Sequence, residues 1–226
     1  MENANRVLCF EDIRKNDAIN TYIAQADACM GAIGYTEHGF RHTTLTAMRA
    51  AELLGDLNYP ERTIELTKIA GYMHDIGNVV NRADHAQSGA ILAFHLLSGL
   101  NMDAGEVAQI ISAIGNHDEG TGAPVSPLAA ALIMADKSDV RRNRVRDAKI
   151  ADDDIHDRVN YSVVKNEFRL NPETNTIELS LTIDLTYCSV MEYFTIFLVR
   201  MQMCKKAAAA LGCQFKLVIN DSVMYS

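Results

Sequence analysis

Several features that would assign a protein to a membrane or to a secretory route are missing from this sequence. No run of about 18 apolar residues occurs, so no transmembrane helix is expected. The polar N-terminal segment MENANRVLCFEDIRKND has no apolar signal region, and the five cysteines are scattered and form no CxxC pair. These features predict a cytoplasmic protein with reduced thiols.

Positive charge is also scarce. The chain has 21 Lys and Arg against 29 Asp and Glu, which gives a net charge of −8 and argues against a broad nucleic-acid-binding face. An acidic protein can still bind an anionic substrate where metal ions or a few arginines reverse the field in one pocket. With 226 residues, 48% of them hydrophobic, the chain can form one large domain, or one domain with a small appendage.

Residues 18–150 carry helical patterns almost throughout. In LTKIAGYM and VAQIISAI the apolar residues recur at i, i+3, i+4 and i+7, which places them on one face of a helix. A further helix is predicted to begin with Ser126 as N-cap and Pro127 in the first turn. Glycines mark the predicted helix ends at Gly55, Gly77, Gly99 and Gly115.

The pattern changes after about residue 160. YSVVKNEFRL (161–170) and TIELSLTID (176–184) alternate β-branched and polar residues around the turn cluster NPET, which predicts a β-hairpin. A long apolar helix over 189–212 and a short strand over 213–221 follow. We therefore predict a mainly α fold.

The predicted fold has two parts. The first is a helical bundle over residues 18–155, and the second is a small C-terminal α+β appendage, β-β-α-β, over residues 156–226. The apolar helix and short strands of the appendage also suggest that a homodimer could form there.

Histidine is scarce, and several of the seven histidines fall at predicted helix termini beside a glycine or an acid. The segment GYMHDIGN (71–78) places a His-Asp doublet at the end of an apolar helix. Because the ends of packed helices can converge, six groups could share one site: His42, His74, Asp75, His85, His117 and Asp136.

Imidazole nitrogen and carboxylate oxygen are both good ligands for divalent ions. His42, His74, Asp75 and Asp136 would give about four protein ligands to one ion and leave positions for water. The other two histidines would supply a second ion, and two ions about 3.5–4 Å apart could share Asp75. Asp136 lies next to Ala135 of the apolar stripe, where an unpaired buried carboxylate would be costly. Metal binding would explain its place, and a salt bridge to an arginine is the alternative explanation.

In this order, the motifs resemble those of the HD superfamily of metal-dependent phosphohydrolases. MHDIGN resembles the defining His-Asp motif, and DHAQSGA resembles the His-x-x-x-Gly segment of two-metal members. NHDEGTG and MADKSD resemble the later His and Asp motifs, and the match covers roughly residues 35–145. The resemblance implies an all-helical core, one or two divalent metal ions, and usually the hydrolysis of a phosphate ester or anhydride.

The sequence departs from the family pattern at two places. Many two-metal relatives continue the doublet with Ile-Gly-Lys, whereas this chain has Asn78 at the lysine position, and Asn78 becomes a candidate substrate-binding residue. This chain has Ala123 where the Gly-x-Gly-Tyr-Pro loop of cyclic-dinucleotide phosphodiesterases has its tyrosine. We therefore do not predict a cyclic dinucleotide as the substrate. The motif set is similar to that of small bacterial or archaeal HD hydrolases acting on nucleotides.

Basic residues follow Asp136 in DKSDVRRNRVR, on a helix that would continue along the pocket wall. Arg141 and Arg144 are candidate phosphate ligands, because arginine offers a planar bidentate fork, and Lys137 is a third candidate.

For catalysis, we expect Asp75 to bridge the metal ions or to orient the attacking water. Asp118 and Lys137 are the candidates for the acid that protonates the leaving group. The ions would activate a water molecule near neutral pH.

The predicted function is metal-dependent hydrolysis of a nucleotide or a related small phosphorylated metabolite. One or two ions are expected, with Fe, Mn, Mg, Zn and Co all left open. Two alternatives remain: a di-iron oxygenase on the same scaffold, and a non-catalytic HD module that binds a ligand or a partner.

Overall fold

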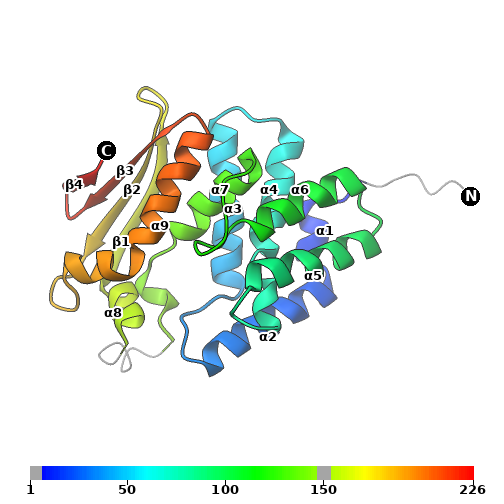
Figure 1. The fold of residues 1–226 in the computed structure, drawn as a ribbon, viewed down its shortest axis with the longest axis horizontal. Helices are drawn as coiled ribbons and strands as arrows, with labels where there is room; N and C mark the ends of the chain where they lie inside the picture. The colour runs from blue at the N-terminus through cyan, green and yellow to red at the C-terminus, as the bar shows by residue number, and fades with distance from the viewer. Residues whose placement is uncertain (1–6, 147–153) are drawn as a thin grey trace, which may run out of the picture.

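The computed structural model describes residues 7–146 and 154–226. Helices make up most of the described chain, and a small sheet lies at its C-terminal end (Figure 1). The mainly α prediction is therefore confirmed. The helical elements are α1 (Phe10–Arg14), α2 (Asp17–Ala32), α3 (Phe40–Asp56), α4 (Glu61–Met73), the 3-10 helix η1 (Ile76–Val79), α5 (His85–Gly99), α6 (Ala104–Gly115), α7 (Pro127–Lys137), the 3-10 helix η2 (Arg142–Arg144), α8 (Ile155–Ser162) and α9 (Val190–Ala210).

Side-chain caps fix the starts of several helices, among them α7 and α9. Ser126 Oγ accepts a hydrogen bond from Ala129 N at 3.1 Å, and Pro127 occupies the first turn of α7, as predicted. Ser189 and Glu192 form a capping box at the start of α9. None of the helices in the described ranges has the length and apolar character needed to cross a bilayer.

The sheet has the order β1 (Val163–Asn171), β2 (Thr176–Ile183), β3 (Gln214–Ile219) and β4 (Ser222–Tyr225). β1 and β2 form the predicted antiparallel hairpin, and β2 pairs with β3 in parallel through the crossover helix α9. The predicted β-β-α-β order is therefore observed. The short β4 extends it, and the start of the first strand moves from residue 161 to 163 because α8 continues to Ser162.

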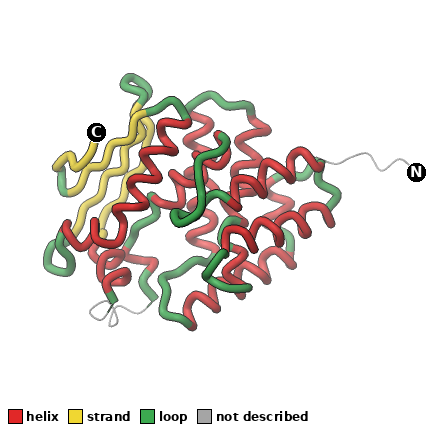
Figure 2. Tube along the Cα trace, viewed as in Figure 1, coloured by secondary structure: helices red, strands yellow, loops and turns green. Residues whose placement is uncertain are grey.

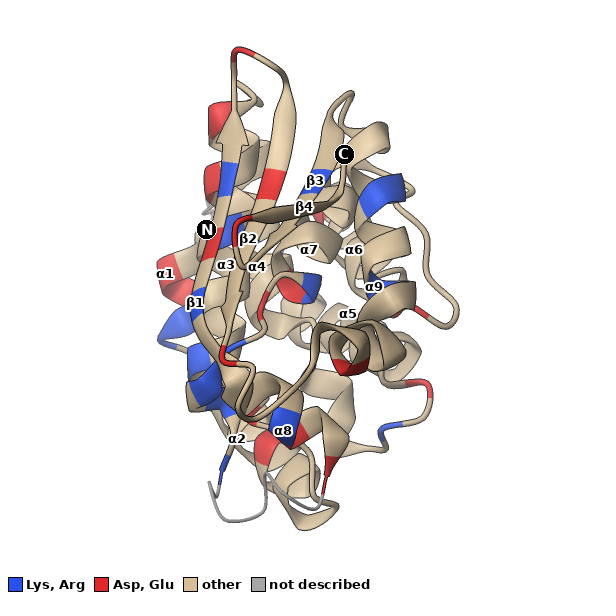
Figure 3. Cartoon of the chain, turned by 90° about the vertical axis from the view of Figure 1, so that its left-hand side faces the viewer, with Lys and Arg blue, Asp and Glu red and all other residues tan. Residues whose placement is uncertain are grey.

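The sheet turns one face inward and the other outward. α9 covers the inner face (Figure 1), while along β2 the polar outer residues Thr176, Glu178, Ser180 and Thr182 alternate with buried apolar ones; Figure 3 shows where Lys, Arg, Asp and Glu lie on the strands. On that face Glu178 pairs with Arg169 at 2.8 Å and with Lys216 at 2.9 Å. The pleat thus separates an apolar core face from a charged solvent face.

A shared hydrophobic core joins the appendage to the bundle. Leu54 of α3 and Met134 of α7 belong to the same buried cluster as Leu179, Phe197 and Leu217 of the sheet and α9. Burying each such side chain stabilises the fold by about 1.5–3 kcal/mol. α9 lies between the sheet and the bundle and contacts α7 (Figure 2).

A second buried cluster lies within the bundle, around Ile23, Ile69, Met73 and Ile110. The division of the chain at residue 155 stays a prediction, as does the homodimer. The predicted helical region extends into residues 147–153, which lie outside the described residues.

Candidate metal centre

The predicted ligands are brought together by helix ends. His42 lies in the first turn of α3, His74 is the C-cap of α4, and Asp75 follows it directly. His85 begins α5, and the remaining two ligands come from the segment after α6 and the last turn of α7. Five of the six side chains are buried, and that of Asp136 is 12% exposed.

Two glycines allow these helix ends to approach. A Cβ at Gly71 would lie 2.7 Å from Cα of Ala47, so glycine lets α4 pack closely on α3, the helix that carries His42. A Cβ at Gly77 would lie 2.0 Å from the carbonyl oxygen of His85. Glycine at these two positions therefore brings α3 and α5 close to the His-Asp doublet.

One group of ligand atoms faces Oδ2 of Asp75. That oxygen lies 3.6 Å from His42 Nε2 and 3.3 Å from His74 Nε2, and the two nitrogens are 3.2 Å apart. Asp136 Oδ1 completes the group at 3.3 Å from His42 Nε2 and 3.7 Å from His74 Nε2.

A second group faces the other oxygen of the same carboxylate. Asp75 Oδ1 lies 3.4 Å from His85 Nε2 and 3.9 Å from His117 Nε2, which are themselves 3.2 Å apart. Ligands about 2.1 Å from one ion lie about 3.0–3.4 Å from each other in octahedral or tetrahedral geometry. Both groups are close to the spacing of a ligand shell, and Asp75 lies between them.

The imidazole hydrogen bonds show which nitrogen is available to bind an ion. His42 Nδ1 lies 2.7 Å from Asp139 Oδ2, and the other three bind backbone carbonyl oxygens: His74 Nδ1 to Gly71, His85 Nδ1 to Arg82 and His117 Nδ1 to Ile114, at 2.8, 3.1 and 2.6 Å. Because these oxygens can only accept, each Nδ1 donates its proton, and in the neutral imidazole each Nε2 turns a lone pair toward the centre. Imidazole lone pairs and carboxylates that face one another repel unless a proton or a cation lies between them, so the donor set fits divalent ions.

The same charges set the titration of the imidazoles. Burial lowers the pKa of His74, but the carboxylates of Asp75 and Asp136 outweigh it and raise this pKa to about 10. For His117, burial and the positive charges of His74 and Lys137 lower the pKa to about 3. A proton on His74 therefore partly balances the two carboxylates, and a bound cation would replace it.

A buried carboxylate that was not among the predicted site residues, Asp139, holds His42 in place. Asp139 accepts hydrogen bonds from His42 Nδ1 and from the Arg141 guanidinium. Burial raises the pKa of Asp139, but the charge of Arg144 and the hydrogen bond from His42 hold it well below its usual range. The local signal that could have identified Asp139 is its place in MADKSD, three residues after Asp136.

The predicted phosphate ligands do not belong to the six gathered groups but bind to residues next to them. Arg144 is buried and donates to the carbonyl oxygens of Glu37 and Asp139, while Arg141 pairs with the Asp139 carboxylate. Asn78 Nδ2 donates to Asp75 Oδ1 at 2.9 Å and so orients the central carboxylate. Their roles toward a substrate stay predictions.

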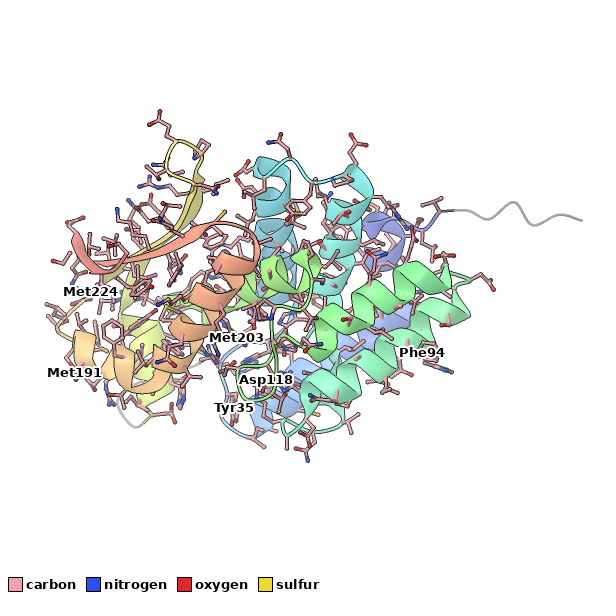
Figure 4. All side chains as sticks on the ribbon, turned by 45° about the horizontal axis from the view of Figure 1, so that its top comes forward. Tyr35, Phe94, Asp118, Met191, Met203 and Met224 are labelled. Atoms are coloured by element: carbon pink, nitrogen blue, oxygen red, sulfur yellow. The ribbon has the colours of Figure 1, made fainter. Side chains whose placement is uncertain are left out.

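The two candidate acids differ in their surroundings. Lys137 Nζ is buried 2.7 Å from Asp136 Oδ2 and 2.6 Å from Glu119 Oε2. Asp118 lies in the loop between α6 and α7 (Figure 4), where its carboxylate accepts a hydrogen bond from Gly120 N at 3.0 Å. The structure thus brings Lys137, but not Asp118, into direct contact with a predicted ligand.

A cavity of about 330 Å³ opens beside this centre, between the bundle and the appendage. His38, whose ring lies 5.6 Å from that of His42, lines it together with Tyr35 and Arg82. Phe197 and Arg200 of α9 also line it. Neither Arg82 nor Arg200 was predicted as a site residue, and no local pattern relates α9 to the distant His-Asp doublet.

The sequence model of the HD domain family matches residues 39–158, which is more than half of the chain. The protein belongs to the HD domain family. This confirms the resemblance drawn from the ordered His and Asp motifs, and all six gathered side chains lie inside the matched range. The HD match ends before the sheet and α9.

A curated relative gives no further information on substrate. The uncharacterized protein MJ1020 of Methanocaldococcus jannaschii is 25% identical over 162 residues, which cover 62% of this chain and 62% of that protein. The chain therefore spans about three fifths of the length of the curated relative that it matches.

Proposed function

We propose that this HD protein is a metal-dependent phosphohydrolase that cleaves a phosphate ester or anhydride of a nucleotide or a related small phosphorylated metabolite. The observation that carries the proposal is the arrangement of four imidazole Nε2 atoms around the Asp75 carboxylate, with Asp136 as a second carboxylate beside two of them, next to a cavity of about 330 Å³. A cavity of this size lies within the range of small-molecule sites.

Each oxygen of Asp75 would hold one ion. His42, His74 and Asp136 would complete the first ion's protein ligands, and His85 and His117 those of the second. When bound, divalent ions polarise phosphoryl oxygens and lower the pKa of bound water. The mixture of imidazole and carboxylate suits first-row divalent metals.

The remaining residues would position these groups and balance their charge. Asn78 fixes the orientation of Asp75, and Asp139 fixes that of His42. Burial lowers the pKa of Lys137, but the charges of Asp136 and Glu119 outweigh it and raise this pKa. Lys137 would therefore stay protonated and supply fixed positive charge, which leaves Asp118 as the candidate for the proton donor to the leaving group.

Elemental analysis of the purified protein, combined with a phosphate-release screen, tests this proposal. The screen would offer nucleotides, phosphomonoesters and phosphodiesters to protein loaded with Mn, Fe, Co, Zn or Mg. We expect one or two ions per chain and metal-dependent release of phosphate or of a nucleotide. Loaded protein that turns over no phosphorylated compound would contradict hydrolysis. Oxygen consumption by the iron form would favour an oxygenase instead, and tight ligand binding without turnover would favour a binding module.

A further inference from the structure

Arg82 lies between η1 and α5 and reaches the centre with both its backbone and its side chain. Its carbonyl oxygen accepts the hydrogen bond from His85 Nδ1 at 3.1 Å. Its guanidinium Nη1 lies 3.8 Å from Asp75 Oδ1 and 3.3 Å from Asn78 Oδ1. The side chain is 24% exposed and lines the cavity, where the guanidinium lies over the Tyr35 ring at 5.6 Å from its centroid. One cation is thus held at the border between the six ligands and the cavity.

The other cations of this region are already paired, so far as the described residues show. Lys137 Nζ lies within 2.7 Å of two carboxylates, and Arg200 Nε donates to Glu119 Oε1 at 3.0 Å. Arg144 donates to backbone carbonyls, and Arg141 pairs with a buried carboxylate. For Arg82 the structure shows one long hydrogen bond to an amide oxygen and a carboxylate beyond hydrogen-bond distance.

The charge balance at the centre points to what Arg82 would bind. Two divalent ions bring four positive charges, and the two carboxylate ligands, Asp75 and Asp136, neutralise two of them. Arg82 adds a further positive charge beside Asp75 Oδ1. An anion that contacts the ions and the guanidinium together would relieve this excess, and a dianionic terminal phosphoryl group would do so better than a singly charged diester.

We propose that Arg82 binds the phosphoryl group of the substrate, at the edge of the metal centre, and favours a terminal, dianionic phosphate. The inference rests on the proposed function for the identity of the ligand. The guanidinium presents two parallel N–H donors to phosphoryl oxygens, which lysine or asparagine cannot do. The rest of the substrate would extend into the cavity past Tyr35.

Binding of inorganic phosphate to the metal-loaded, full-length protein tests the inference. Isothermal titration would compare wild type with Arg82→Ala, Arg82→Lys and the control Arg169→Ala, whose guanidinium pairs with Glu178 on the outer face of the sheet. We expect Arg82→Ala to weaken phosphate binding by about tenfold or more, Arg82→Lys to restore part of it, and Arg169→Ala to leave it unchanged. Metal content, measured on every variant, should equal that of wild type.

Three results would overturn the inference: unchanged phosphate affinity in Arg82→Ala, metal-loaded wild type that binds no phosphate, or loss of metal from Arg82→Ala. The last would show that Arg82 supports the ligands instead of the substrate. Phosphate binding that depends on Arg82, in a protein that hydrolyses nothing in the screen, would support this inference while contradicting the proposed function. Hydrolysis by wild type together with unchanged phosphate affinity in Arg82→Ala would do the reverse.

Discussion

In the helical bundle, polar groups at the helix termini point inward and gather around Asp75, whereas on the outer face of the sheet they point to solvent and pair with one another. Both regions place charges of opposite sign close together, but the surroundings differ. Asp75 is 4% exposed, while the Arg169 side chain, which pairs with Glu178, is 65% exposed. Water screens the exposed pair and contributes little screening to the buried groups. The comparison teaches that the surface pair balances its own charge, whereas the buried cluster has a donor set that could hold a cation.

Replacing the shared carboxylate should have the largest effect. Asp75→Ala removes one ligand from each predicted ion, so we expect loss of both ions and of turnover, with the helical circular dichroism retained. His95→Ala, on the exposed side of α5, is the matched control and should keep wild-type metal content. Wild-type levels of metal in Asp75→Ala, measured by elemental analysis, would contradict the assignment of the centre.

Removing the support behind a ligand should have a smaller effect. Asp139→Asn keeps the shape of the side chain but removes the charge that fixes the His42 imidazole, so we expect metal affinity to fall by about 10- to 100-fold. Competition with a metallochromic chelator would measure this. Unchanged affinity would mean that His42 does not depend on Asp139 for its orientation.

Metal affinity should also depend on pH. Because Asp75 and Asp136, against the effect of burial, raise the pKa of His74 to about 10, an ion has to displace a proton from this imidazole near neutral pH. Higher pH removes the competing proton, so affinity should increase by about tenfold per pH unit between pH 6 and 9. Titrations in buffers of different ionisation enthalpy would report the released proton, and no proton release would contradict the prediction.

The smallest expected effects concern stability, and they compare a partly buried ion pair between α9 and the bundle with an exposed pair on the sheet. Arg200→Ala leaves Glu119 and Lys137 as a partly buried pair without its third member, and we expect it to lower the free energy of unfolding by about 1–3 kcal/mol. Arg169→Ala should change it by about 0.5 kcal/mol or less. Urea unfolding would measure both, and equal effects would remove the distinction between the two kinds of pair.

Local patterns were sufficient to predict most elements and the six gathered groups. Helix periodicity, Ser126 with Pro127, and the histidines at helix ends are signals within about one turn of the residue concerned. The four-residue β4 was missed because so short a segment has no distinctive period. The start of the first strand was set too early because α8 ends in Tyr161 and Ser162, which fit either structure.

Tertiary contacts decided the rest of the site. Arg200 reaches the cavity because α9 packs on α7, and Asp139 faces His42 across 97 residues of sequence. Arg141 and Arg144 were selected as phosphate ligands by their place after Asp136, but the fold directs their guanidinium groups to Asp139 and to backbone carbonyls. Such partners depend on which helices meet, and the order of residues along one helix does not contain that information.

A crystal of the manganese-loaded protein, measured at wavelengths near the metal absorption edge, tests the central claim most directly. The account predicts anomalous peaks in the centre, one between His42, His74 and Asp136 and a second between His85 and His117, with Asp75 contacting both. Anomalous density that lies away from these side chains, or their separation into different regions, would contradict it.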